Sequence, residues 1–118
     1  MTVAVKRVYD RLDPKDGLRI LVDRLWPRGM TKEKAAIDVW MKTVAPSTGL
    51  RRWFQHDSRK WPVFKEKYFA ELDAKPEAVD ELLSYVNKYD VVLLYAAKDP
   101  EHNHAVVLKE YIQLALSR

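Results

Sequence analysis

The longest apolar run of the chain, Val91-Val92-Leu93-Leu94-Tyr95-Ala96-Ala97, decides its class of fold. A strand that is apolar at every position is typical of the centre of a sheet that is covered on both faces. The residues after it, 100–116, repeat apolar side chains at the spacing of a helix. The run therefore predicts an α/β fold in which helices flank a small sheet.

Two further strands are expected near the N-terminus, at residues 3–9 and 18–26, where β-branched and other apolar residues gather. Turn residues at 13–17 separate them. This short connection predicts a hairpin if the two strands pair directly, since a parallel crossover needs a dozen or more residues. A shorter strand is expected at 37–41. The sheet should thus be small and mixed or mostly parallel.

Helical patterns occupy most of the remaining chain. Thr31 can cap one of these segments, Pro46-Ser47-Thr48 opens another, and Pro62 and Pro76 lie in the first turns of two more. Helices are expected at about 31–35, 46–56, 61–72, 76–86 and 100–116. A chain of 118 residues fits one α/β domain spanning residues 1–118.

The composition excludes several classes of protein. With 47% hydrophobic and 32% charged residues, the chain is typical of globular proteins, not of disordered ones. The absence of cysteine excludes disulfides, thiolate zinc sites, iron–sulfur clusters and a cysteine nucleophile. No apolar run is long enough to cross a membrane, and the N-terminus does not resemble a signal peptide. A cytoplasmic protein without a membrane partner is expected.

Positive charge gathers in the first half of the chain. The net charge is +4, eight of the nine arginines precede residue 60, and all four tryptophans lie between Trp26 and Trp61. Arginine beside aromatic rings can bind phosphate or carboxylate groups, and it can also form a nucleic-acid surface. A solvated basic face over a tryptophan core is the plain alternative, and exposed tryptophans would instead suit a protein partner.

Ligands of open α/β sheets bind outside the carboxyl ends of the strands, which directs attention to the segments 23–29 and 95–104. If their strands are parallel and close, polar groups of both segments converge on an anion site. Arginine and lysine would hold charge, Asn103 would orient the ligand, and His104 with Asp99 would transfer a proton. The predicted catalytic residues are His104 and Asp99, and the predicted ligand-binding residues are Arg24, Arg28, Gly29, Tyr95, Lys98 and Asn103.

Each of these residue types also has a structural interpretation. The order Asp99-Pro100-Glu101 is typical of a helix start, with Asp99 as its cap. His102 and His104 are spaced like a metal-binding pair, but residues two apart on a helix face different ways. No metal site is therefore predicted, and His102 stays a secondary candidate.

His56 and Asp57 form another secondary pair, of an acid or base and its partner. A histidine at the end of a helix is equally explained by the helix dipole.

Arginines elsewhere in the sequence also need explanation. Arg24, flanked by apolar residues in an expected strand, requires a partner, for which Asp38, Asp99 or a bound anion would serve. Arg51 and Arg52 precede Trp53 on a helix, where one is expected in solvent and the other over an aromatic ring.

Several segments together resemble the YeaO-like branch of the DUF488 family of domains of unknown function. The most specific is the block Val-Asp-Arg-Leu-Trp-Pro-Arg-Gly at 22–29, joined by Ala45-Pro46-Ser47 and by residues 93–98. The resemblance implies an α/β fold of this size and no settled activity. Another branch carries a Cys-His-Arg cluster at the start of the last helix, where this chain has Asn103-His104-Ala105. The missing cysteine puts a thiol role in doubt, while the matching histidine favours His104.

The favoured function is binding, with or without turnover, of a small anionic or phosphate-bearing ligand at the carboxyl ends of the strands. The alternatives are a nucleic-acid-binding or regulatory module using the basic, tryptophan-rich half, and a protein-interaction module. Whether the protein is an enzyme, which cofactor it uses and its oligomeric state stay open at this point.

Overall fold

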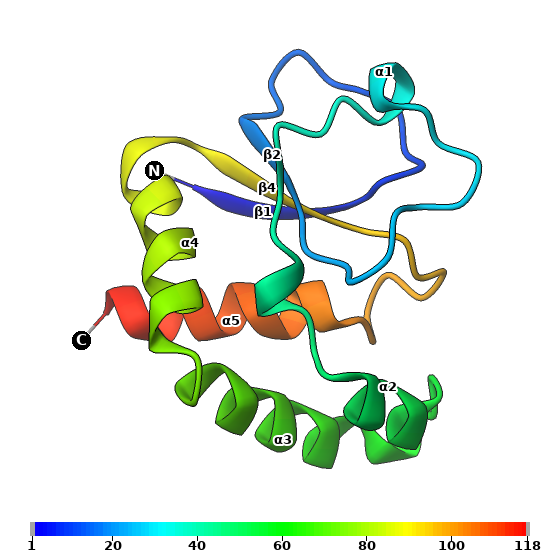
Figure 1. Cartoon of the computed structure of the whole chain (residues 1–118), viewed down its shortest axis with the longest axis vertical. Helices are drawn as coiled ribbons and strands as arrows, with labels where there is room; N and C mark the ends of the chain where they lie inside the picture. The colour runs from blue at the N-terminus through cyan, green and yellow to red at the C-terminus, as the bar shows by residue number, and fades with distance from the viewer. Residues whose placement is uncertain (1, 118) are drawn as a thin grey trace.

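The computed structural model describes residues 2–117 and contains a four-stranded sheet (Figure 1). Its strands are β1 (Val3–Arg7), β2 (Leu18–Leu21), β3 (Val39–Trp40) and β4 (Val91–Tyr95). They lie in the order β1-β4-β2-β3, and all three pairings are parallel. The predicted α/β class is confirmed, and β4 is the central strand that its apolar sequence indicated.

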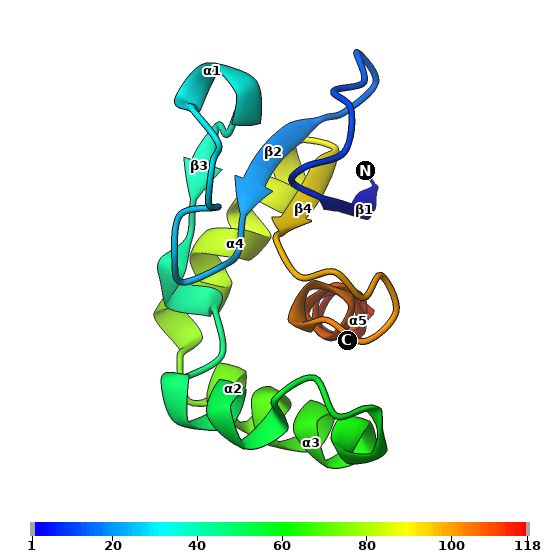
Figure 2. The same cartoon turned by 90° about the vertical axis from the view of Figure 1, so that its right-hand side faces the viewer.

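Five helices surround the sheet, close to the ranges expected from the sequence. They are α1 (Lys32–Ala35), α2 (Thr48–Phe54), α3 (Trp61–Asp73), α4 (Pro76–Lys88) and α5 (His104–Leu116). Two short 3-10 turns, η1 (Lys42–Val44) and η2 (Ser58–Lys60), precede α2 and α3. Helix α5 packs on β1 and β4, and α3 packs on the outer side of α5 (Figures 1 and 2).

Alternate side chains of the strands enter two apolar cores on opposite faces of the sheet. All five residues of β4 are buried. Leu93 and Tyr95 enter the larger core beneath the helices, whereas Val92 and Leu94 enter a smaller one that includes Ala35 of α1. Burial on both faces explains why β4 shows no polar alternation.

The predicted hairpin between the first two strands is wrong. Strands β1 and β2 do not pair with each other, because β4 lies between them and pairs with both. A buried central strand needs hydrogen-bond partners along both edges, and this long-range pairing overrides the short connection. Just before β2, Gly17 packs tightly against Asp90, which precedes β4. A Cβ atom at position 17 would lie 2.0 Å from the carbonyl oxygen of Asp90.

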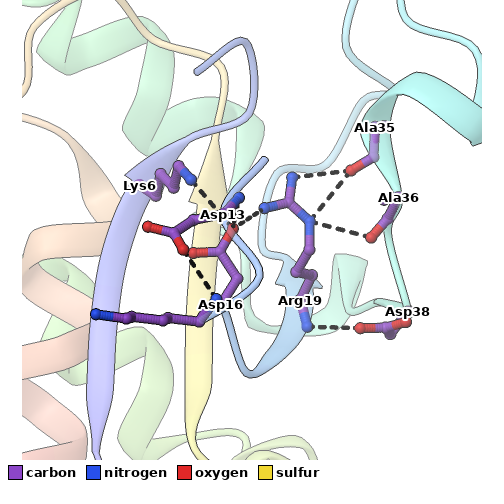
Figure 3. A network of polar contacts seen from close by, with 8 residues as sticks. Lys6, Asp13, Asp16, Arg19, Ala35, Ala36 and Asp38 are labelled. Carbon is purple, nitrogen blue, oxygen red and sulfur yellow. Dashed lines mark hydrogen bonds and ion pairs between the residues drawn. The ribbon is translucent and has the colours of Figure 1, made fainter. Parts of the chain in front are cut away.

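A buried arginine fixes α1 to the sheet (Figure 3). Arg19 of β2 is 6% exposed, and its Nη2 donates to the carbonyl oxygen of Ala35 at 2.9 Å. Its Nη1 lies 2.6 Å from Asp16 Oδ2, which also contacts Lys6 Nζ at 3.1 Å. The buried arginine within a strand is therefore Arg19, whereas Arg24 lies in the loop after β2, which ends at Leu21.

Asp38 also contacts Arg19: its carboxylate accepts a hydrogen bond from the Arg19 backbone N–H at 2.8 Å. Asp38 was one of three partners considered for Arg24, beside Asp99 and a bound anion, and its contact is with Arg19 instead. Within residues 2–117, no helix is long and apolar enough to cross a membrane.

Candidate functional site

The carboxyl ends of β2 and β4 lie next to each other, as the predicted site requires. The two strands pair in parallel, with Leu21 opposite Leu94, so their arrowheads in Figure 2 point the same way, toward α2 and the start of α5. One hydrogen bond joins the loops that follow: Asp23 Oδ2 accepts from the backbone N–H of Ala96 at 3.0 Å. The two strand ends therefore form one continuous edge.

An open cavity of about 650 Å³ lies at this edge, between the loops and α2. We call it the basic cavity, because its lining includes three arginines, three histidines and one carboxylate. These charged and titratable residues are Arg24, Arg51, Arg52, His56, His102, His104 and Asp23. Apolar side chains, among them Phe54 and Phe64, line other parts of the wall. The geometry thus offers excess positive charge beside an apolar surface.

His104 is held by Asp23, a partner that the sequence analysis did not identify. Its Nε2 lies 2.9 Å from Asp23 Oδ1 and 3.0 Å from the carbonyl oxygen of Val22. Both oxygens can only accept, so Nε2 carries a proton and donates to the carbonyl. Asp23 Oδ1 receives no hydrogen bond, so its contact with Nε2 is a close approach and not a hydrogen bond. In the neutral ring, Nδ1 is then left as the nitrogen that can accept a proton.

Asp99, which was expected to transfer a proton together with His104, contacts His102 instead. Its carboxylate accepts from the backbone N–H groups of Glu101 at 2.8 Å and His102 at 3.1 Å, and contacts His102 Nδ1 at 3.0 Å. These hydrogen bonds, that from Glu101 first, hold the pKa of Asp99 below its usual value. Asp99 thus closes a turn before α5 and orients the ring of His102.

Helix α5 begins at His104, four residues later than expected, and Asn103 is its cap. Asn103 is 3% exposed; its Oδ1 accepts from the backbone N–H of Val106, and its Nδ2 donates to the carbonyl oxygen of Asp99. Asn103 lines the basic cavity, yet both ends of its amide are already engaged. This arrangement favours a structural role over the predicted role in orienting a ligand.

Four predicted ligand-binding residues lie outside the lining of the basic cavity. Tyr95 points into the larger core, where burial raises the pKa of its hydroxyl. Lys98 is exposed. Arg28 and Gly29 lie in an exposed turn after β2, in which Gly29 has a φ of 78° and the carbonyl oxygen of Arg28 accepts from Tyr9. A position at the carboxyl end of a strand therefore does not by itself place a residue in the cavity.

His56 and Asp57, the secondary candidate pair, have different surroundings. His56 has a φ of 57°, follows the end of α2 and lines the basic cavity. Asp57 caps η2 and pairs with Arg59, and the hydrogen bond from the Arg59 side chain is the main cause of its lowered pKa. His56 therefore joins the site without Asp57 as its partner.

Arg51 and Arg52 are cavity residues that the sequence analysis missed. The cations over the ring of Trp53 are Lys60 and Lys67, at 5.0 and 4.7 Å from its centre. The two arginines are left exposed on α2 and line the basic cavity. No local pattern marks them, because only the tertiary packing of α2 brings them to the strand ends.

Ser47 fixes the helix that carries these arginines. Its Oγ accepts from the backbone N–H of Leu50 at 3.1 Å, which caps α2. Its hydroxyl and backbone N–H both donate to the carboxylate of Glu71 on α3, at 2.6 and 2.8 Å. The orientation of α2 is thus set by a side-chain contact with α3.

Arg24 lies at the strand-end edge, and within residues 2–117 its buried Nε has no hydrogen-bond partner. The same part of the chain contains no group of three or more histidine, aspartate or glutamate side chains arranged to hold a metal ion.

The family of the chain follows from comparison with known proteins. Residues 2–118 match the family described as "Inactive DUF488-N3 subclade". The chain is 42% identical over 113 residues to the uncharacterized protein YeaO of Escherichia coli (strain K12), a match that covers 96% of this chain and 98% of YeaO. It is 37% identical over 110 residues to the uncharacterized protein Rv3073c of Mycobacterium tuberculosis, covering 93% and 92%. No solved structure matches. The chain belongs to the DUF488 family, in the subclade described as inactive DUF488-N3.

Proposed function

We propose that this protein binds a small anionic molecule in the basic cavity and does not turn it over. The observation that carries the proposal is the charge of that cavity. Three arginines face it, whereas its one carboxylate, Asp23, already accepts from Ala96 and contacts His104. An anion would therefore meet guanidinium groups whose charge the cavity itself leaves largely unbalanced.

Arginine suits such a ligand better than a general basic surface would. A planar guanidinium presents paired N–H donors that match the oxygens of a phosphate or carboxylate. Arg24 comes from the loop after β2, and Arg51 and Arg52 come from α2, so the charge reaches the cavity from two elements. A ligand bound between them would join the strand ends to α2.

Binding without turnover is supported by the start of α5. By the resemblance described above, another branch of the family has a cysteine where this chain has Asn103, and here the amide of Asn103 caps the helix. The subclade of this chain is also described as inactive. His104 keeps a proton-accepting nitrogen, but no cysteine is present in the sequence to act with it.

Calorimetric titration with inorganic phosphate and pyrophosphate at low salt tests the proposal. The double variant Arg51→Gln/Arg52→Gln should weaken binding at least about tenfold, the effect of losing one or more charge-assisted hydrogen bonds. The control Arg11→Gln/Lys15→Gln removes the same charge from exposed residues outside the cavity and should bind like the wild type. Absence of saturable binding, or an equal loss in the control, would contradict the proposal.

The two alternative functions receive less support from the tryptophans. Each of the four is at least partly buried. Trp26 and Trp40 pack edge to face, and their indole nitrogens donate to backbone carbonyl groups. Trp53 lies under two lysines, and Trp61 stacks on Phe64. These internal contacts leave less ring surface for nucleic-acid bases or a protein partner. We also propose that residues 1–118 form a single domain and that the protein acts in the cytoplasm.

A further inference from the structure

We infer that the ligand of the basic cavity is an anion attached to an apolar or aromatic body. This inference rests on the proposed function and assigns its class of ligand. It starts from the size of the cavity. A water molecule takes about 30 Å³ of liquid, so a phosphate ion would occupy only a small part of a cavity of about 650 Å³. Volumes of this order suit organic ligands.

The wall of the basic cavity indicates what the rest of the ligand is made of. Its uncharged lining includes three polar residues, Thr48, Gln55 and Asn103, and apolar ones, among them Phe54, Phe64, Ala45 and Pro46. Phe54 and Phe64 belong to the core and are 5% and 2% exposed, and they stack at 4.4 Å between ring centres, so the small part of the wall that they form is apolar and fixed. A ligand with many hydroxyl groups would lose its bound water there without gaining hydrogen bonds. An apolar body would gain from the same contact.

Leu25 adds a second apolar surface, at the opening of the cavity. It follows Arg24 in the loop after β2, lines the cavity and is 66% exposed. A bound apolar group would cover this side chain while Arg24 contacts the anion. The neighbouring positions 24 and 25 therefore offer the two contacts that such a ligand needs, a cation and an apolar side chain.

Four probes separate the anion from the body that carries it: inorganic phosphate, glucose 6-phosphate, 1-naphthyl phosphate and uncharged 1-naphthol. Titrated into the wild-type protein by calorimetry, 1-naphthyl phosphate should bind at least about tenfold more tightly than each of the others. Burial of only about 55 Å² of apolar surface is worth that factor. Leu25→Ser should reduce the advantage of 1-naphthyl phosphate over glucose 6-phosphate at least about threefold and leave phosphate binding unchanged. The matched control Leu12→Ser changes a residue that is 48% exposed and outside the cavity, and it should keep the advantage.

Each contrary result has its own meaning. Equal affinity for the two phosphate esters would overturn the ligand class and leave the proposed anion binding intact. Naphthol binding as tightly as its phosphate would overturn the inference, because the anion would then contribute nothing. Failure of all four probes to saturate the protein would overturn the inference and the proposed function together.

Discussion

Replacing Asp23 with asparagine tests the contact that holds the two strand-end loops and His104 together. Asp23 accepts from the backbone N–H of Ala96 through one oxygen and lies 2.9 Å from His104 Nε2 through the other. The amide nitrogen of asparagine cannot accept a hydrogen bond. It would therefore face either the N–H of Ala96 or the protonated Nε2 of His104, so that two donors meet.

The size of the effect follows from burial, since the side chains of His104 and Asp23 are only 14% and 15% exposed. A buried donor without an acceptor costs about 1–3 kcal/mol. For a chain of this length, each kcal/mol lowers the Tm by about 4 °C, so Asp23→Asn should lower it by about 4–12 °C.

Thermal and urea unfolding, followed by tryptophan fluorescence, measure this loss directly. Asp80→Asn is the matched control: it makes the same change of charge at an exposed position of α4 and should shift the Tm by no more than about 2 °C. A Tm of Asp23→Asn equal to that of the wild type would show that the loops are held without this carboxylate.

Three further predictions concern the framework of the fold. Arg19→Met should lower the free energy of unfolding by about 3–5 kcal/mol in urea titrations, because it leaves the buried partners of Arg19 unpaired. An effect under about 1 kcal/mol would contradict the role given to this arginine. Gly17→Ala should destabilise the protein by at least about 2 kcal/mol, because its Cβ would lie 2.0 Å from the carbonyl oxygen of Asp90. A variant as stable as the wild type would show that Gly17 and Asp90 do not approach so closely. Burial raises the pKa of Asp16, but hydrogen bonds from Lys6 and Asp13 and the charges of Lys6 and Arg19 outweigh it and leave the pKa lowered. Asp16 therefore adds stability that is fully present above its ordinary pKa of 3.8 and is lost as the pH falls through the lower pKa of the folded state. Asp16→Asn should make the free energy of unfolding depend less on pH in the acid range. An unchanged dependence on pH would count against the ion pair.

Residues 91–95 show which part of the fold the sequence could predict. Five consecutive apolar residues have no exposed face, so a central strand was expected and found. The pairing of β1 could not be predicted in the same way. The short segment between β1 and β2 favours a hairpin locally, whereas the choice of β4 as partner depends on residues more than eighty positions away. The class of fold is thus a local property of the sequence, and the strand order is not.

The site divides in the same manner. Adjacent strand ends were a sound basis for expecting Arg24 and His104 at one edge, and both line the cavity. Asp99 was expected near His104 but contacts His102, because α5 begins at His104 and not at residue 100, and Asp99 closes the turn before it. Arg51 and Arg52 were missed because the packing of α2, which Ser47 and Glu71 fix, has no signal in the local sequence.

Mapping phosphate binding by NMR shows directly whether an anion binds in the basic cavity. In a titration of the ¹⁵N-labelled protein with inorganic phosphate, we expect saturable shifts of backbone resonances at residues 23–25, 51–56 and 96–104, and of the arginine side-chain Nε–H groups of Arg24, Arg51 and Arg52. Resonances at residues 13–17, which lie at the opposite end of β2 and β4 from the cavity, should stay unchanged. Shifts centred on another surface, or none that saturate, would contradict the assignment of the basic cavity as the anion site.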